Sequence, residues 1–469
     1  MGKKQAAFGL RDKVGYALGD FGCNMSFQLV TNYAMIYFTQ GMGLSLKSWA
    51  LIVVLAKIFD AINDPIIGAM VDRRQPGKNG KFRPWIFYGS FTILITTVLF
   101  FVDIRALPYA LRFAYTLLVY CLWSIAYTAA NVPYGSLNAA LTDDISGRAQ
   151  LSSLRSIGAG LAVLPIMLAM PKLIYGAKDQ VTGIAPIIPE RFVWIALVMG
   201  LFGLAGFMAL YFLTTERLVI TQQKEKYSFT KSLTSFLKNR AALGISLASF
   251  AQLAFLGSNM TTLQYVFQVY FKNTDLIVLG NLVVFAPMVV FIPLIPKLTR
   301  RFGKKEISTW PMLLGIAVMA VMPFVALPGN DKGGWIYLIL MGIANMSTGV
   351  FLLITWSFVA DAVDYQDLKT GRREEGTVYA VYSFVRKMGQ AVSQGLVALL
   401  LSAVGFDPEN VIATTDKVAK GVLQISIILP LVGIVLMFAG MQFIYNLDKG
   451  ATIKMSEDLR ARREAGLGS

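Results

Sequence analysis

Long apolar stretches alternate with short polar ones along almost the whole chain. A helix needs about 20 mostly apolar residues to cross a bilayer, and the sequence has twelve stretches of that kind. Their length and spacing predict an all-α membrane protein with 12 transmembrane helices. The predicted spans are 15–40, 46–71, 84–103, 110–136, 150–174, 192–214, 242–270, 275–298, 307–327, 334–360, 377–404 and 420–445.

The longest polar stretch between spans, "ERLVITQQKEKYSFTKSLTSFLKNR", leaves six spans on each side. A weak repeat accompanies this division, because "VDRRQPGKNGKFRPW" follows the second span and "LTRRFGKKE" follows the eighth. Parallel halves of six helices, with a substrate site between them at mid-membrane, describe the major facilitator fold. The predicted parts are an N-terminal six-helix bundle (1–215), a cytoplasmic middle loop (216–241), a C-terminal six-helix bundle (242–446) and a cytoplasmic tail (447–469).

Composition and charge agree with this topology. The chain is 55% hydrophobic, its mean hydropathy is +0.58 and its net charge is +16. Most of the 43 Lys and Arg residues lie in the N-terminus, the even-numbered loops, the middle loop and the tail. By the positive-inside rule both termini are cytoplasmic. The basicity is therefore explained by topology, and we expect the lipid bilayer, with no nucleic acid, as a partner.

Several classes of enzyme and pump are excluded or disfavoured by composition. The chain has no His, which excludes a His-dependent triad, a zinc His cluster and a haem His. No Walker-type "GxxxxGK[ST]" stretch occurs, so an ATP-driven pump is not supported. An intramembrane aspartyl protease needs two Asp on different helices, whereas Asp60 and Asp64 share one span. We expect neither enzymatic activity nor a cofactor.

The second span carries charged residues inside an otherwise apolar helix. On a helical projection Lys57, Asp60, Asn63 and Asp64 fall within an arc of about 120°, so they share a face that must look away from lipid. Two carboxylates one turn apart cannot both ionise cheaply in a low dielectric. Three solutions are open: the carboxylates share a proton, Lys57 neutralises one of them, or a metal cation binds.

A purely structural ion pair between Lys57 and one Asp would leave the other carboxylate over. Asn63 adds a neutral carbonyl oxygen, and Pro65 leaves a backbone carbonyl one turn earlier without its helical donor. These groups favour a site for a cation or a proton, with Asp60 and Asp64 as ligands in the metal case.

Several motifs in order resemble the glycoside, pentoside and hexuronide:cation symporters, the family of the melibiose permease and the glucuronide carrier. The resemblance implies the major facilitator fold and a bacterial inner membrane. It also implies that Asp60, Asn63, Asp64 and Thr128 bind the coupling cation, Na+ or H+; the presence of Asn63 leans toward Na+. The matching stretches are "YALGDFGCN", "FDAINDP", "GKFRPW", "YTAANVPYGSL", "VADAVDY" and "TGRREEGTVYAVYSFVRKMGQA".

The residues expected to bind the sugar depart from the galactoside pattern of that family. Asn24 and Asn131 stand where galactoside-recognising relatives have aspartates, and Gly135 replaces a tryptophan. Basic side chains remain in other spans: Arg155 opens the fifth span, and Arg386 and Lys387 lie together in the eleventh. Fewer carboxylates with several cations favour an anionic ligand such as a hexuronide. If acids neutralise these cations, the pocket suits a neutral pentoside or xyloside instead.

Aromatic side chains suited to stacking on a sugar ring occur in the fourth, tenth and eleventh spans. The candidates are Tyr134, Trp356 and Tyr382, beside Tyr127 and Tyr379. Packing or an interfacial belt is the alternative role for each. Trp356 is the best candidate, because its place before Asp361 matches the glucuronide-type relatives.

Charged residues near the predicted cytoplasmic ends of spans are candidates for gate or latch pairs between the halves. "GAMVDRR" resembles the facilitator loop signature, in which the acidic and basic groups latch neighbouring helices. Stabilisation of helix ends is the equal alternative for the others. The candidate gating residues are Asp20, Asp72, Arg73, Asp361, Asp364, Arg373 and Glu375.

Taken together, these features predict a secondary symporter that couples Na+ or H+ entry to uptake of a hexuronide, glucuronide or other glycoside by alternating access. A neutral pentoside symporter, a lysolipid:Na+ symporter, and a channel or non-transporting sensor on the same fold stay open as alternatives.

Overall fold

The computed structural model describes residues 8–77, 79–142, 144–218, 236–370 and 375–464. In these residues all the regular secondary-structure elements are helices, as predicted, and β-structure is limited to two isolated bridges. The chain divides into two compact units. Unit 1 comprises Met1–Lys224 and Asp407–Ala413, and unit 2 comprises Glu225–Phe406 and Thr414–Ser469. The main division thus falls within the segment expected to form the middle loop.

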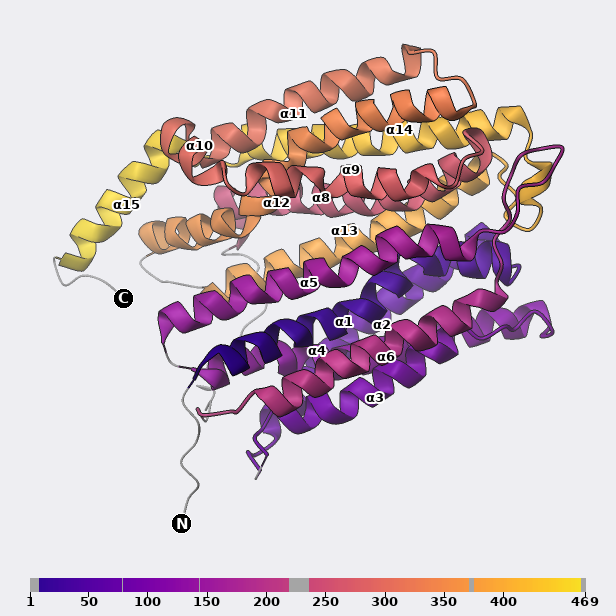
Figure 1. Cartoon of the computed structure of the whole chain (residues 1–469). Coiled ribbons are helices and arrows are strands. Elements are labelled where there is room, and N and C mark those ends of the chain that lie inside the picture. Colours follow the sequence, from indigo (N-terminus) through magenta and orange to yellow (C-terminus); the bar gives the residue numbers. More distant parts are fainter. Residues whose placement is uncertain (1–7, 78, 143, 219–235, 371–374, 465–469) are drawn as a thin grey trace. The chain divides into compact units, whose positions relative to one another are not determined.

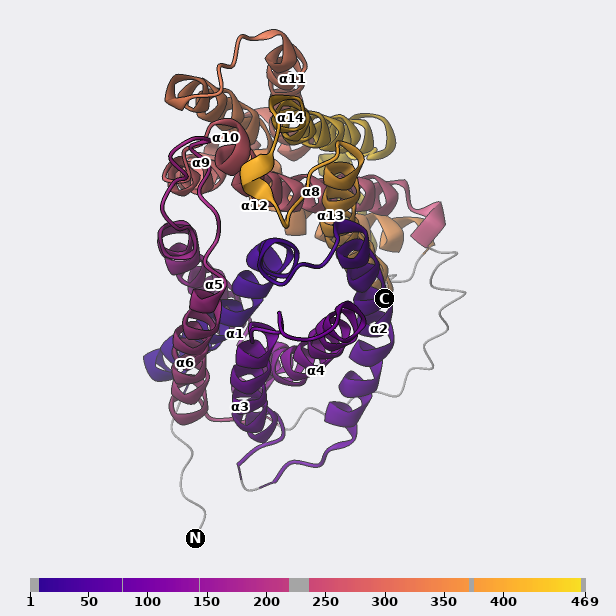
Figure 2. The same ribbon diagram turned by 90° about the vertical axis from the view of Figure 1, so that its right-hand side faces the viewer.

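Unit 1 is a bundle of six helices that run roughly along one direction (Figure 1, Figure 2). Helix α1 packs against α5 and α6, α3 packs against α4 and α6, and α2 packs against α4. One π-helical turn, Tyr37–Gly41, extends α1. The helices are α1 (Leu10–Ile36), α2 (Leu46–Arg73), α3 (Arg83–Phe100), α4 (Tyr109–Leu141), α5 (Ile145–Ile174) and α6 (Glu190–Leu213).

Unit 2 repeats the packing order of unit 1. Helix α8 packs against α13 and α14, α11 packs against α12 and α14, and α9 packs against α12. Each contact has its counterpart among α1 to α6, which is the signature of an internal repeat. The helices are α8 (Arg240–Tyr265), α9 (Leu276–Phe291), α10 (Ile295–Phe302), α11 (Lys304–Val321), α12 (Asp331–Thr370), α13 (Glu375–Ala403), α14 (Asp416–Ala439) and α15 (Lys449–Glu464).

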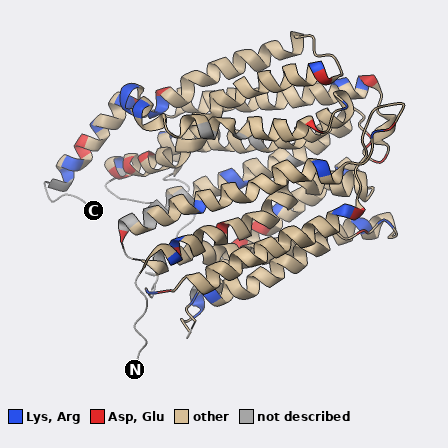
Figure 3. Ribbon diagram, viewed as in Figure 1, with Lys and Arg blue, Asp and Glu red and all other residues tan. Residues whose placement is uncertain are grey.

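All predicted spans except 275–298 coincide with one long helix each, although the number of membrane crossings stays a prediction. Eight helices in the described part are long and apolar enough to cross a membrane. Helix α9, with 16 residues, is not among these eight, and neither are α1, α2 and α13. Figure 3 shows long uncharged stretches along the helices, with most Lys, Arg, Asp and Glu residues toward their ends.

Two boundaries differ from the prediction. The single span expected over 275–298 is broken into α9 and α10, because Pro293 and Pro296 cannot donate backbone hydrogen bonds to a continuous helix. The tail expected after residue 446 contains a further helix, α15.

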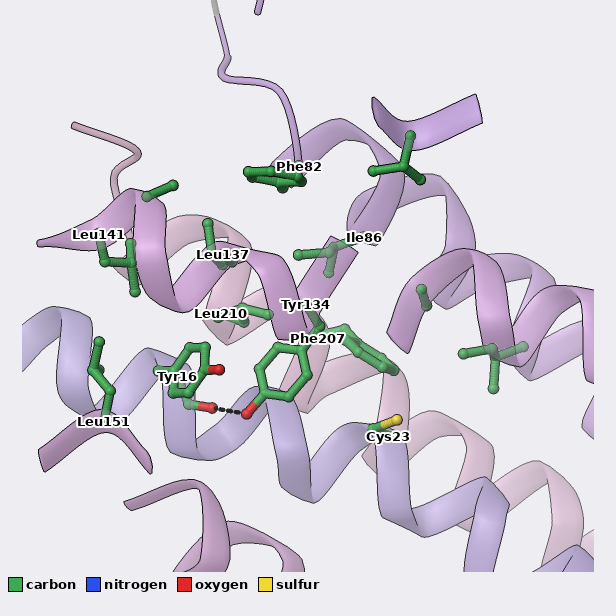
Figure 4. Packing of buried hydrophobic residues seen from close by; sticks show 14 of the residues in the cluster. Tyr16, Cys23, Phe82, Ile86, Tyr134, Leu137, Leu141, Leu151, Phe207 and Leu210 are labelled. Atoms are coloured by element: carbon green, nitrogen blue, oxygen red, sulfur yellow. Dashed lines mark hydrogen bonds between the residues drawn. The ribbon is translucent and has the colours of Figure 1, made fainter. Parts of the chain in front are cut away.

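The core of unit 1 brings residues of all six helices α1 to α6 together as buried aromatic and aliphatic side chains (Figure 4). Helices α1 and α5 approach closely at a glycine: a Cβ atom on Gly158 would overlap the carbonyl oxygen of Ala17. Small residues allow such close contact between membrane helices. This approach brings the side chains of α5 onto those of α1.

Candidate functional site

The two aspartates of α2 face two hydroxyl groups of α4. The Thr128 hydroxyl donates a hydrogen bond of 2.8 Å to Asp64 Oδ1, and the Ser124 hydroxyl donates to Asp60 Oδ1. Ser124 and Thr128 are one turn apart on α4, as are Asp60 and Asp64 on α2. Each hydroxyl residue is 64 positions from the aspartate to which it donates. The contacts are therefore two rungs in register between α2 and α4, and we call them the α2–α4 ladder.

Lys57 extends this arrangement by one turn. Its ammonium nitrogen lies 3.1 Å from Asp60 Oδ2 and 5.9 Å from the centre of the Tyr120 ring. The ion pair that the sequence left open is thus present, and it engages Asp60 in preference to Asp64. Both oxygens of Asp60 have partners within unit 1, Lys57 on one and Ser124 on the other.

Asn63 directly precedes Asp64 on α2 and is buried, and its side-chain nitrogen has no hydrogen-bond partner among the described residues. A half-turn of an amide exchanges its oxygen and nitrogen, so the same position can present a carbonyl oxygen. Asp64, Thr128 and Asn63 then supply a carboxylate, a hydroxyl and an amide oxygen. Hard cations prefer oxygen ligands of these kinds.

A second polar cluster joins α1 to α5. Arg155 Nε donates to Asp20 Oδ1 at 2.9 Å, and Asn24 Nδ2 donates to Asp20 Oδ2 at 3.0 Å. Asp20 is buried, whereas the side chain of Arg155 is 41% exposed. The sequence predicted a gate for Asp20 and the sugar site for Asn24 and Arg155; the structure joins all three within unit 1. Their roles stay predictions. Asn131, the other expected sugar ligand, accepts a hydrogen bond of 3.5 Å from the Cys23 thiol.

Tyr134 supports the Arg155 guanidinium from beneath. The guanidinium lies 5.1 Å from the centre of the Tyr134 ring, and that ring stacks on Tyr16 at 4.7 Å. The Tyr134 hydroxyl donates to the backbone carbonyl of Tyr16 at 2.9 Å, as Figure 4 shows. Tyr134 is fully buried, which differs from the open stacking face expected from the sequence. Its place is that of a support for Arg155.

Gly135 leaves open space beside the same arginine. Gly135 is exposed. A Cβ atom added to it would have one neighbouring heavy atom within 4 Å, Arg155 Nη1 at 4.0 Å. The terminal nitrogens of Arg155 therefore border a position where a side chain is missing. The departure of Gly135 from the family pattern thus bears directly on the surroundings of Arg155.

Unit 2 holds an arginine on aromatic rings as well. The Arg386 guanidinium lies 5.0 Å from the Trp356 ring centre and 5.7 Å from that of Tyr382. Trp356 is 48% exposed, but Tyr382 is fully buried, and its hydroxyl bonds to Ser249 at 2.9 Å and Thr355 at 3.2 Å. Trp356 keeps an exposed face, whereas Tyr382, like Tyr134, is a support.

Arg386 pairs with no carboxylate among the described residues, and its Nε atom is buried without a hydrogen-bond partner there. Lys387 follows it on α13. Arg386 thus differs from Arg155 of unit 1, which is paired with Asp20.

The other candidate gating residues lie in three situations. Asp361 on α12 pairs with Lys304, whose ammonium also donates to Ser357 Oγ at 3.2 Å, and Asp364 lies one turn further along α12. Arg73 is exposed at the end of α2. The side chains of Asp72 and Glu375, and the whole of Arg373, lie outside the described residues.

Ser124 and Lys304 are the partners that sequence reasoning missed. Ser124 had a signal, because it precedes Thr128 by one turn just as Asp60 precedes Asp64. Lys304 had only its place in the repeated basic motif "LTRRFGKKE".

Two units that repeat one packing order of long apolar helices, with paired polar groups buried within them, define a multi-pass membrane transporter. Residues 15–449 match the model of the family MFS/sugar transport protein, and the chain belongs to that family. The solved structure of a D-xylose-proton symporter has the same fold, with a TM-score of 0.63 at 13% identity over 95% of this chain and 99% of that one.

Curated relatives extend over nearly the whole chain. An uncharacterized symporter of Bacillus subtilis (strain 168) is 30% identical over 97% of this chain and 96% of its own length. The glucuronide carrier protein homolog of Escherichia coli (strain K12) is 28% identical over 88% and 87%. The isoprimeverose transporter of Lactiplantibacillus pentosus is 26% identical over 96% and 91%.

Proposed function

We propose that this protein is a sugar symporter of a bacterial inner membrane that couples entry of Na+ or H+ to uptake of a glycoside by alternating access. The observation that carries the proposal is the α2–α4 ladder, a pair of partly buried carboxylates inside a helix bundle of a transporter family. Ionisable groups at such depth are costly unless they serve an ion or proton path. Two relatives, a glucuronide carrier homolog and an isoprimeverose transporter, support sugar as the cargo, and the symporter of Bacillus subtilis supports coupled transport.

The coupling cation binds at the Asp64 rung of the ladder. Asp60 is already engaged by Lys57 and Ser124, so it orients and neutralises Lys57. Thr128 and Asn63 offer neutral oxygens beside Asp64. Neutral oxygens favour Na+, because a proton needs only the carboxylate itself. Cation and sugar raise each other's affinity by the same factor, which is the basis of coupled transport.

The sugar is an anionic glycoside of the hexuronide class. Arg386 lacks a carboxylate partner in the described part of unit 2, lies over the exposed Trp356 and is followed by Lys387. A guanidinium pairs well with a carboxylate, and an indole face with a sugar ring. A neutral pentoside is the second candidate, and the neutralised Arg155 of unit 1 favours it.

Uptake into right-side-out vesicles tests the proposal. We would offer labelled phenyl β-glucuronide and phenyl β-xyloside, each driven separately by an inward Na+ gradient and by a pH gradient. Accumulation of the glucuronide supports the hexuronide assignment, and the effective gradient names the ion. Accumulation of the xyloside alone supports the neutral candidate. Accumulation of neither refutes sugar symport and leaves a lysolipid carrier or a sensor.

The variant Asp64→Cys is the matched test of coupling. We expect it to lose gradient-driven accumulation while downhill exchange of sugar continues, because the cation site is gone and the fold is kept. Accumulation that survives in Asp64→Cys would refute the assignment of the cation to this rung.

A further inference from the structure

Asp20 is the group that decides how much charge Arg155 presents. The two lie 135 residues apart in sequence, and the distance from Arg155 Nε to Asp20 Oδ1 is 2.9 Å. Asn24 holds the other carboxylate oxygen at 3.0 Å and also donates to the Asp20 carbonyl at 2.9 Å. Two donors, Arg155 and Asn24, therefore hold the Asp20 carboxylate in one orientation.

The pair is asymmetric in its exposure. Asp20 is buried, whereas the Arg155 side chain is 41% exposed. If a substrate carboxylate formed an ion pair with Arg155 in place of Asp20, the buried Asp20 carboxylate would lose its counter-charge, which is strongly unfavourable. Arg155 therefore stays with Asp20, and an incoming anion meets a pair whose net charge is zero.

The exposed part of the guanidinium still has hydrogen-bond donors. Its Nη1 atom borders the open space at Gly135, where a Cβ atom would be 4.0 Å away. The Tyr134 ring, at 5.1 Å, fixes the plane of the guanidinium from the buried side. Donors in a fixed plane with no net charge suit neutral hydroxyl groups.

We infer that Asp20 is a specificity-determining residue: it neutralises Arg155, so that unit 1 offers donors to sugar hydroxyls at Gly135 and does not select for a carboxylate. This inference rests on the proposed function, since it concerns the same substrate. It also assigns Asp20 a task other than gating between the halves.

Asp20→Asn tests the inference, because it removes the charge and keeps the shape. We would measure binding of labelled phenyl β-glucuronide and phenyl β-xyloside to purified protein in detergent, since the two probes differ by the ring carboxylate. We expect the ratio of glucuronide to xyloside affinity to rise about tenfold, because Arg155 becomes an uncompensated cation. In the double variant Asp20→Asn, Arg155→Gln the ratio should return to that of the parent.

Asp12→Asn is the matched control. Asp12 is also a buried carboxylate on α1, and it pairs with Arg217 at 2.9 Å. Loss of this pair should lower stability without changing the affinity ratio. If Asp20→Asn does not fold, Arg155→Gln alone gives the reverse test: it leaves Asp20 unpaired and should lower the ratio below that of the parent.

The outcomes separate the two proposals. A parent protein that binds either probe, with the ratio unchanged in Asp20→Asn or, where that variant does not fold, in Arg155→Gln, would overturn the role of Asp20 alone. Equal changes in transport rate for both probes, at constant ratio, would assign Asp20 to a gate and also overturn it. A parent protein that binds neither probe would overturn the proposed function and this inference together.

Discussion

Replacing Thr128 by valine removes one hydroxyl from the Asp64 rung and keeps the side-chain volume. The matched change, Ser124→Ala, removes the hydroxyl of the Asp60 rung one turn away. The two variants ask which rung of the α2–α4 ladder binds the coupling cation, because the hydroxyls face different carboxylates on the same pair of helices.

The size of the effect follows from the geometry. A hydroxyl has one donor and two lone pairs, so Thr128 can keep its 2.8 Å hydrogen bond to Asp64 while its oxygen faces a cation. The hydrogen bond to Asp64 is present both with and without the cation, so its loss cancels in the free energy of cation binding. The net effect of Thr128→Val is therefore the loss of the contact between the hydroxyl oxygen and the cation. Such a contact contributes about 1–2 kcal/mol, or roughly 5- to 30-fold in affinity.

The assay is the concentration of Na+, or of H+, that gives half-maximal sugar uptake. We expect Thr128→Val to raise this concentration roughly 5- to 30-fold. Ser124→Ala should change it less than about threefold, because Asp60 remains paired with Lys57 at 3.1 Å. A large effect of Ser124→Ala with none of Thr128→Val would place the cation at Asp60 and refute our reading of the ladder.

Three further changes test other parts of the structure. Trp356→Ala should weaken glucuronide binding about fivefold, because it removes the ring beneath Arg386; unchanged glucuronide affinity in a titration would contradict this. Glu216→Gln should lower the thermal midpoint in detergent, because the Glu216 carboxylate accepts backbone hydrogen bonds of 2.7 to 2.8 Å at the start of α3, an interaction of about 1–3 kcal/mol; an unchanged midpoint would argue against it. Gly158→Ala should reduce the yield of folded protein, because its Cβ overlaps the Ala17 carbonyl and overpacking costs about 1–3 kcal/mol; normal yield and midpoint would show that α1 and α5 can separate.

The positions of the helices could be predicted from the sequence because hydropathy is a local property. A stretch of apolar residues must form a helix in lipid, whatever its neighbours are. Helix geometry alone also puts Asp60 and Asp64 on one face of α2. For the same local reason Lys57 could be named as a partner for these carboxylates, since it lies on the same helix and within a turn of Asp60.

Contacts between helices were decided by the tertiary structure. Ser124 and Thr128 meet Asp60 and Asp64 because of the rotation of α4 about its axis and its position along α2. No local sequence pattern determines that rotation or position.

The same reason explains why the surroundings of some candidate residues could not be predicted. Tyr134 was a candidate for stacking on a sugar ring, because the sequence does not show whether an aromatic side chain faces a cavity or the packed core. Its stacking on Tyr16 in the structure shows that the ring is buried. Asp20 and Arg155 meet across 135 residues because Gly158 lets α5 approach α1. The sequence by itself therefore determined the helices and the acidic face of α2, whereas the tertiary structure decided which charges are neutralised, because that depends on how neighbouring helices pack.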